Sequence, residues 1–223
     1  MRIQNISRPF NTSAFPTTGK PNHDIAAAKA ALTKTGFRWN AQNQLLDKDT
    51  GAPVTFSILV SASSAERIQM ANLVAADWKE LGVNAQVVTL EFRSLIDRVM
   101  NTRQFDAVLL GLGGGDADPN ADLNVWLSSG AMHLWNPNQK QPATPWEAEI
   151  DNLMRRQLTT VTPAARRKLY QQALSILTRE LPMIFLVSPN IVTAQNGNIG
   201  NFKPAALDHY TLWNAGELYL LRK

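Results

Sequence analysis

The chain has 223 residues, of which 44% are hydrophobic and 18% are charged, a composition typical of a globular protein with one large domain or two small ones. It contains no cysteine, which excludes disulfides, thiolate catalysis and cysteine metal sites. No segment approaches the roughly 20 consecutive apolar residues of a membrane-spanning helix.

The formal net charge is +4 and the isoelectric point is about 9.5. Short basic clusters at Arg155-Arg156 and Arg166-Arg167-Lys168 both lie in predicted helices. They are interpreted as solvated helix faces rather than as a nucleic-acid footprint. The first residues, MRIQNISRPF, lack the apolar core of a secretory signal, so the protein is either cytoplasmic or an internal fragment with its signal upstream.

The N-terminal part begins with a polar, proline-containing stretch over residues 1–23, which indicates an extended arm. Asp24 is placed to cap a helix that runs to about Lys34 and ends at Gly36. Turn-forming residues between apolar pairs predict a hairpin over residues 37–53.

The strongest architectural signal is a βαβαβ pattern. Strands are predicted over 54–60, 83–90 and 105–110, and helices over 64–81 and 92–101. Ser63 and Glu66 have the spacing of a capping box, and Gly82 ends the first of these helices. This order implies a largely parallel sheet with both faces covered.

The third strand runs into a glycine-rich and acidic turn, LLGLGGGDADPNAD, at residues 109–122. In α/β folds, ligands bind outside the carboxyl ends of the strands, and glycines let a ligand approach the main chain. Asp118 is expected to cap a short helix that begins at Pro119, whatever else the turn does.

Other interpretations of this turn fit poorly. A dinucleotide fingerprint would need glycine at Asp116, and a phosphate-binding loop would need a Lys-Ser/Thr pair. The acids at 116, 118 and 122 resemble a calcium loop, but Ala121 stands where glycine is required and Leu127 where the bidentate glutamate is required. The histidines have no metal-ligand spacing, and no GxSxG elbow is present.

The C-terminal part is predicted to contain helices over 121–127, 146–158 and 163–181, the last with Thr162 as cap. A buried strand is expected over Met183–Val187, followed by a loop-like tail. Trp78 belongs to the core by its helical spacing. Trp126, Trp135 and Trp146 could line a cleft, although burial as structural anchors is the commoner role for such residues.

In order and spacing, several segments resemble the C-terminal half of the family 5 extracellular solute-binding proteins, the peptide, dipeptide and nickel receptors of ABC importers. These segments are HDIAAAKAALTKTGF, GAPVTFSILV, WKELGVNAQVV, QFDAVLLGLGGGDADP, WEAEIDNLM and ARRKLYQQALSILTRELPMIFL. The resemblance implies an α/β fold, namely a type II lobe like those of periplasmic binding proteins, with a mixed, mostly parallel sheet and helices on both faces.

The resemblance also implies a domain organisation and partners. Residues 1–36 would form an arm and first helix, 37–187 the second lobe, and 188–223 a tail that returns to a first lobe absent from this chain. The protein would be periplasmic or extracytoplasmic, with a signal peptide upstream. It would capture a small solute, possibly a peptide, by lobe closure and deliver it to an ABC permease without catalysis, cofactor, metal or nucleic acid.

The expected ligand contacts are Gly113, Gly114, Gly115, Asp116, Trp135 and Phe185, with Asp118 and Pro119 as the structural cap. In peptide-binding members an aspartate that pairs with the ligand amino group stands at the position of Gly115, so selection for an α-amine is in doubt. The glycines could still offer main-chain hydrogen bonds to an extended ligand, and an uncharged, modified or sugar-like ligand is equally compatible.

Two other functions remain open from the sequence. One is the effector domain of a transcription regulator, although no helix-turn-helix is recognisable. The other is a metal-assisted hydrolase that uses Asp116, Asp118 and Asp122.

Overall fold

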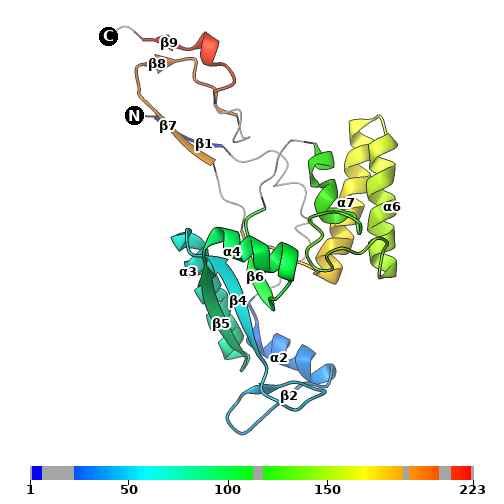
Figure 1. The fold of residues 1–223 in the computed structure, drawn as a ribbon. Coiled ribbons are helices and arrows are strands. Elements are labelled where there is room, and N and C mark those ends of the chain that lie inside the picture. The colour runs from blue at the N-terminus through cyan, green and yellow to red at the C-terminus, as the bar shows by residue number, and fades with distance from the viewer. Residues whose placement is uncertain (1, 7–22, 113–117, 188–190, 206–211, 222–223) are drawn as a thin grey trace. The chain divides into compact units, whose positions relative to one another are not determined.

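The structure is a computed structural model that describes residues 2–6, 23–112, 118–187, 191–205 and 212–221. It contains two compact units, residues 20–113 and residues 1–19 together with 114–223 (Figure 1).

The unit of residues 20–113 begins with helix α2 (Ile25–Lys34), which starts and ends as the sequence predicts. The Asp24 carboxylate accepts a hydrogen bond from the Ala27 N–H at 2.8 Å, and Gly36 follows the helix with φ of +97°. The predicted hairpin is also confirmed, with β2 (Arg38–Trp39) antiparallel to β3 (Leu45–Leu46).

The centre of this unit is a parallel three-stranded sheet in the order β5-β4-β6. Its strands are β4 (Thr55–Ser61), β5 (Asn84–Leu90) and β6 (Ala107–Leu109). Helix α3 (Ala65–Glu80) joins β4 to β5, so the predicted βαβ crossover is confirmed. The predicted Ser63–Glu66 capping box is wrong, because Ser64 is the cap and accepts from the Arg67 N–H at 3.3 Å. The Ser63 hydroxyl is instead 2.8 Å from the Ser61 hydroxyl.

Apolar residues cover both faces of the sheet. Ile58 and Val60 pack with Ala71 of α3 on one face. Leu59 points to the other face because side chains alternate along a strand, and it is buried, as are Leu95 and Val99 of the second crossover. That crossover contains α4 (Phe92–Ile96), which contacts β4, and a π-helix, η1 (Asp97–Thr102), where the sequence predicts one regular helix.

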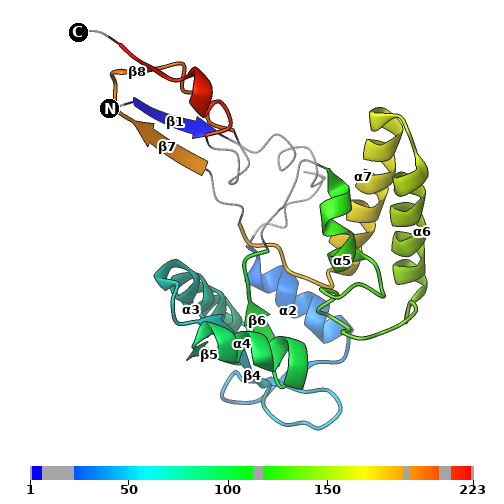
Figure 2. The ribbon, with the colours of Figure 1, turned by 45° about the horizontal axis from the view of Figure 1, so that its top comes forward.

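The second unit is built around two long helices, α6 (Pro145–Thr159) and α7 (Pro163–Glu180), which lie side by side (Figures 1 and 2). Both predictions are confirmed, and each helix has proline in its first turn. Thr162 precedes α7 but makes no side-chain capping bond. The preceding segment forms a short 3-10 helix, η2 (Pro119–Asp122), and α5 (Leu123–Trp126). The core of the unit contains Trp126, Ile150, Leu153, Met154, Ala173, Leu174 and Leu177.

The buried strand predicted over Met183–Val187 is wrong. Leu181 ends α7 in a left-handed conformation with φ of +48°. The following segment pairs with no strand in the described part of the chain, and Ile184 and Val187 are 69% and 73% exposed. Without a neighbouring strand to bond its main chain, an apolar run does not form a strand however high its β propensity.

The tail after residue 188 is more regular than the loop expected from the sequence. Strand β7 (Ile191–Gln195) pairs antiparallel with β1 (Arg2–Ile6), at the other end of the chain. Further on, β8 (Ile199–Gly200) pairs with β9 (Tyr219–Leu220), which follows the short 3-10 helix η4 (Ala215–Glu217). Pairing between distant segments leaves little local trace in a sequence, which is why the tail was predicted as loop. No helix among the described residues has the length and hydropathy required to cross a bilayer.

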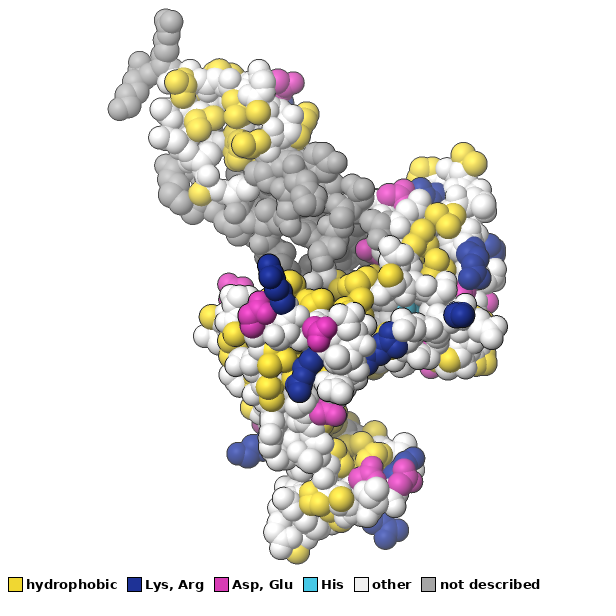
Figure 3. Space-filling view, in the orientation of Figure 1, with side chains coloured by type: hydrophobic (Ala, Val, Ile, Leu, Met, Phe, Trp, Pro, Cys, Tyr) yellow, Lys and Arg dark blue, Asp and Glu magenta, His cyan; other side chains and the backbone are white. Residues whose placement is uncertain are grey.

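Charged side chains of both signs are interspersed on the visible face of the residue 20–113 unit (Figure 3). This face of the unit therefore offers no single-sign field that would steer a highly charged partner.

Candidate solute-binding site

The turn singled out by the sequence leaves the carboxyl end of β6 and re-enters the described structure at Asp118. Four of the predicted ligand contacts lie outside the described residues, namely Gly113, Gly114, Gly115 and Asp116. The described residues on either side of the turn belong to different units, and each side is considered separately.

On the β6 side, the guanidinium group of Arg67 lies against the main chain of Gly111. A Cβ atom placed on Gly111 would be 2.6 Å from Arg67 Nη2 and 3.2 Å from its Cζ. Glycine therefore leaves room for this approach. Arg67 belongs to the first turn of α3 and is half-buried. It takes part in none of the ion pairs among the described residues.

Arg67 was not identified from the sequence. Its position follows from the parallel pairing of β4 with β6, which puts the start of α3 and the residues after β6 at the same edge of the sheet. The sequence signal was present in the βαβ pattern, but which residue of the first helical turn would reach Gly111 depends on three-dimensional geometry. A cation at this edge is suited to bind a carboxylate or another anion.

On the other side of the turn, Asp118 occupies the N-cap position predicted for it and accepts from the Asn120 N–H at 2.9 Å, with Pro119 in the first turn. Its two oxygens also accept bonds of 2.7 and 2.8 Å from Arg166 of α7. The bidentate bond from this guanidinium lowers the pKa of the Asp118 carboxyl group below its usual value. The ion pair joins the end of the turn to a long helix.

The Arg166 side chain is itself held by a buried amide. Its Nη2 and Nε atoms donate to Gln157 Oε1 at 3.0 and 3.2 Å. The Gln157 amide nitrogen donates to Asn120 Oδ1 at 2.6 Å. Because Gln157 is fully buried, the polar groups of this network satisfy one another, and the pairing geometry is fixed.

A second contact lies one helical turn further along both segments. The Tyr170 hydroxyl donates to Asp122 Oδ2 at 3.3 Å. Burial raises the pKa of Asp122 and, together with the nearby carboxylate, raises the pKa of Tyr170. The spacings 118/122 and 166/170 place both pairs on matching faces of their segments.

Trp135 and Phe185, the other predicted ligand contacts, lie in the second unit. The Trp135 indole N–H donates to Glu147 Oε1 at 3.1 Å, and its ring centroid is 3.8 Å from that of His133. The indole N–H of Trp135 is therefore already hydrogen-bonded within the protein. Phe185 is 41% exposed, with its ring centroid 6.4 Å from that of Trp126.

A buried polar cluster around Glu147 is the main feature of this unit that the sequence interpretation missed. Glu147 accepts from the main-chain N–H groups of Ala143 and Thr144. It also accepts from the side chains of Trp135 and Gln139. A signal was available, because Thr144 and Glu147 have the spacing of a capping box, which the structure contains.

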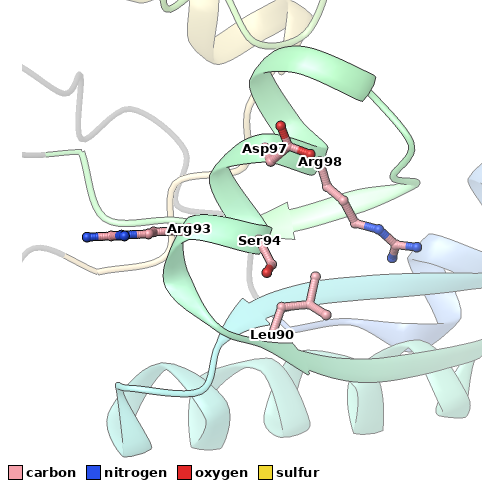
Figure 4. A pocket seen from close by; sticks show the side chains of 5 residues that line it. All are labelled: Leu90, Arg93, Ser94, Asp97 and Arg98. Atoms are coloured by element: carbon pink, nitrogen blue, oxygen red, sulfur yellow. The ribbon is translucent and has the colours of Figure 1, made fainter.

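A concavity of about 460 Å³ is lined by Leu90, Arg93, Ser94, Asp97 and Arg98 (Figure 4). The guanidinium groups of Arg93 and Arg98 point away from each other (Figure 4), and the polar lining residues are exposed. They do not converge on one ligand group. The described residues also contain no group of three His, Asp or Glu side chains suited to a metal ion.

Comparison with known proteins identifies the class to which this fold belongs. Residues 4–133 match the family described as bacterial extracellular solute-binding proteins, family 5 (middle region). The chain belongs to this family. Its members are periplasmic solute-binding proteins that work with ABC permeases, and the family is not an enzyme family.

Curated relatives include the probable ABC transporter periplasmic-binding protein SapA of Escherichia coli, 31% identical over 54% of this chain and 21% of its own length. Di/tripeptide-binding protein 4 of Pseudomonas aeruginosa is 27% identical over 81% of this chain and 31% of its own length. The chain therefore spans about a fifth to a third of the length of these relatives.

Solved structures confirm the predicted fold class, a type II lobe like those of periplasmic binding proteins. The oligopeptide-binding protein AppA of Bacillus subtilis, in complex with a nonapeptide, superposes with a TM-score of 0.69 at 20% identity, over 94% of this chain and 40% of AppA. The periplasmic binding protein MelB of Agrobacterium fabrum, in complex with stachyose, gives a TM-score of 0.70 at 19% identity, over 80% of this chain and 28% of MelB.

Proposed function

We propose that this chain is part of the second lobe of a solute-binding receptor of an ABC importer, and that it binds a small solute without altering it. Family membership supports the proposal most directly. In this proposal residues 37–187 form the second lobe and residues 188–223 return to a first lobe outside this chain; the relatives, of which the chain covers 21% and 31%, are long enough to contain such a lobe. A periplasmic location, with a signal peptide upstream, belongs to the same proposal.

The proposed ligand surface combines the glycine turn with the Arg67 side chain. Main-chain groups of Gly113, Gly114 and Gly115 would bond an extended ligand, and Arg67 beside Gly111 would pair with an anionic group on it. Asp116, Trp135 and Phe185 are the other ligand contacts proposed from the sequence. Because Gly115 carries no charge, we do not expect a free α-amine to be required.

The carboxylates of Asp118 and Asp122 already bind other side chains of the protein, which argues against metal-assisted hydrolysis. Asp118 makes a bidentate ion pair with Arg166, and Asp122 accepts from Tyr170. A metal at this position would have to displace both partners.

The test is a thermal-shift screen of the full-length receptor with di- and tripeptides, their N-acetylated forms and neutral oligosaccharides. A ligand at one hundred times its Kd stabilises the receptor by about 2.7 kcal/mol. We expect N-acetylated and free peptides to stabilise equally, Arg67→Gln to weaken ligands with a free carboxylate, and Gly115→Asp to restore preference for a free amine. Turnover of any of these compounds, or unchanged ligand preference in both variants, would refute the proposal.

A further inference from the structure

The hairpin formed by α6 and α7 carries an uninterrupted basic stretch. Residues 152–179 contain six Lys and Arg residues and no Asp or Glu. Three of the six are paired, since Arg155 bonds Asp151, Arg166 bonds Asp118 and Arg179 bonds Glu180.

The three remaining cations are Arg156, Arg167 and Lys168. All three are exposed, and none takes part in an ion pair among the described residues. The carboxylate of Asp151 is buried and already bound to Arg155. The charge of these three side chains is therefore not neutralised within the hairpin.

Two of these cations, Arg156 and Lys168, line a groove between the helices. Arg156 and Thr160 line it from α6, and Ala165, Lys168, Leu169 and Gln172 line it from α7. Its volume is about 340 Å³, which is large enough for a phosphate group. Figure 3 shows Lys and Arg side chains together with apolar and some acidic ones on the visible face of this hairpin.

The turn next to the groove exposes apolar side chains. Val161, at the point where the chain passes from α6 to α7, is 92% exposed, and Leu158 is 46% exposed. A single exposed apolar residue is ordinary. Here, however, the most exposed one lies at the end of a hairpin in which residues 152–179, on both sides of the tip, contain cations and no acidic residue.

We propose that the tip of the α6–α7 hairpin docks on an anionic phospholipid bilayer. Val161 would enter the headgroup region, while Arg156 and Lys168 contact lipid phosphates and Arg167 adds long-range attraction. Cations near an anionic membrane surface are each worth roughly a fivefold gain in affinity. An acidic protein partner would use the cations equally well but has no need of the exposed valine, which is why the bilayer is favoured. The proposal does not depend on the identity of the solute.

The experiment is co-sedimentation of the 223-residue chain with vesicles of phosphatidylcholine, with and without phosphatidylglycerol. We expect binding only to the mixed vesicles. Arg156→Gln with Lys168→Gln should weaken it about 25-fold, from two cations at roughly fivefold each. Val161→Ser should weaken it severalfold without any change in charge. The matched control is Lys34→Gln with Lys48→Gln, which removes the same charge from exposed sites on the other unit.

Two further titrations separate the sources of negative charge. Inorganic phosphate, followed by calorimetry, and poly-L-glutamate should each bind the chain far more weakly than the mixed vesicles do. The proposal is overturned if the mixed vesicles do not bind, or if both double variants lose binding equally. It is also overturned if Val161→Ser has no effect, or if phosphate or polyglutamate binds as tightly as the bilayer.

Discussion

The buried carboxylate of Glu147 offers the sharpest test of how the second unit is held together. Its side chain is 3% exposed. Oε2 accepts from the main-chain N–H groups of Ala143 and Thr144 at 2.8 and 2.9 Å. Oε1 accepts from Trp135 at 3.1 Å and Gln139 at 3.2 Å, and His133 Nε2 lies 3.3 Å away. The carboxylate thus joins the connection before α6 to the start of that helix.

Glu147→Gln keeps the shape of the side chain but replaces one oxygen with an NH2 group. Whichever way the amide is turned, that group meets two donors, so at least two charge-assisted bonds are lost. Hydrogen bonds to charged groups are worth about 1.5–3 kcal/mol each. We therefore expect the free energy of unfolding of this unit to fall by about 3–6 kcal/mol, a large part of the 5–15 kcal/mol usual for a domain.

The measurement is urea unfolding followed by tryptophan fluorescence, because Trp135 and Trp146 lie beside this cluster. The matched control is Glu149→Gln, on the same helix but exposed, which should change stability by no more than about 0.5 kcal/mol. A loss below about 1 kcal/mol in Glu147→Gln, or equal losses in both variants, would refute this reasoning.

The same carboxylate should make stability depend on pH. Burial raises the pKa of Glu147, but bonds from Trp135, Gln139, His133 and the main chain lower it by more, so the net shift is downward from 4.5. A carboxyl group with a lowered folded-state pKa stabilises the fold above its unfolded pKa and loses that contribution as the pH falls through the folded value. We expect unfolding free energy to decline from about pH 5 downward in the native protein and to decline less in Glu147→Gln.

Three further predictions concern the two units. Gly82→Ala should destabilise the residue 20–113 unit more than Gly51→Ala in urea unfolding. Both glycines have positive φ, but only at Gly82 would the new Cβ come within 3 Å of main-chain atoms, whereas at Gly51 nothing lies within 4 Å. Arg166→Gln should raise the pKa of Asp118 back toward 3.8, measured by NMR titration, because the guanidinium is the main cause of its lowering. Gly111→Ala should leave stability nearly unchanged, since the clash is with the flexible end of an arginine side chain, but it should weaken anionic ligands of the full-length receptor as that side chain is displaced.

The local architecture could be predicted from the sequence where one element carries its own signal. The apolar spacing of α3, α6 and α7, together with the glycine after α3 and the proline at the start of α7, fixed these helices within a residue or two. The parallel order of the sheet followed from the alternation of strands and helices, because a short crossover helix between adjacent parallel strands leaves few topologies.

What could not be predicted depends on contacts between distant residues. The β1–β7 pair joins the two ends of the chain, and no local pattern specifies such a partner. The strand predicted over Met183–Val187 is wrong for the opposite reason, because its apolar composition is that of a strand, but it pairs with none of the strands in the described part of the chain. A high β propensity allows a segment to form a strand, but the segment becomes one only where a neighbouring strand pairs with it.

On both sides of the glycine turn, too, local features could be predicted from the sequence, whereas contacts between distant residues could not. The capping role of Asp118 could be predicted because it is local: its carboxylate accepts from the N–H of Asn120, two residues further along the chain. Its pairing with Arg166, 48 residues further along the chain, could not be predicted from the sequence. The approach of Arg67 to Gly111 could not be predicted either. A sequence interpretation that begins from the glycine turn therefore finds the position of a ligand but not the charges around it. Arg67 lies against Gly111 and takes part in no ion pair among the described residues, so ligand charge, rather than ligand length, is the property to vary first when the solute is sought.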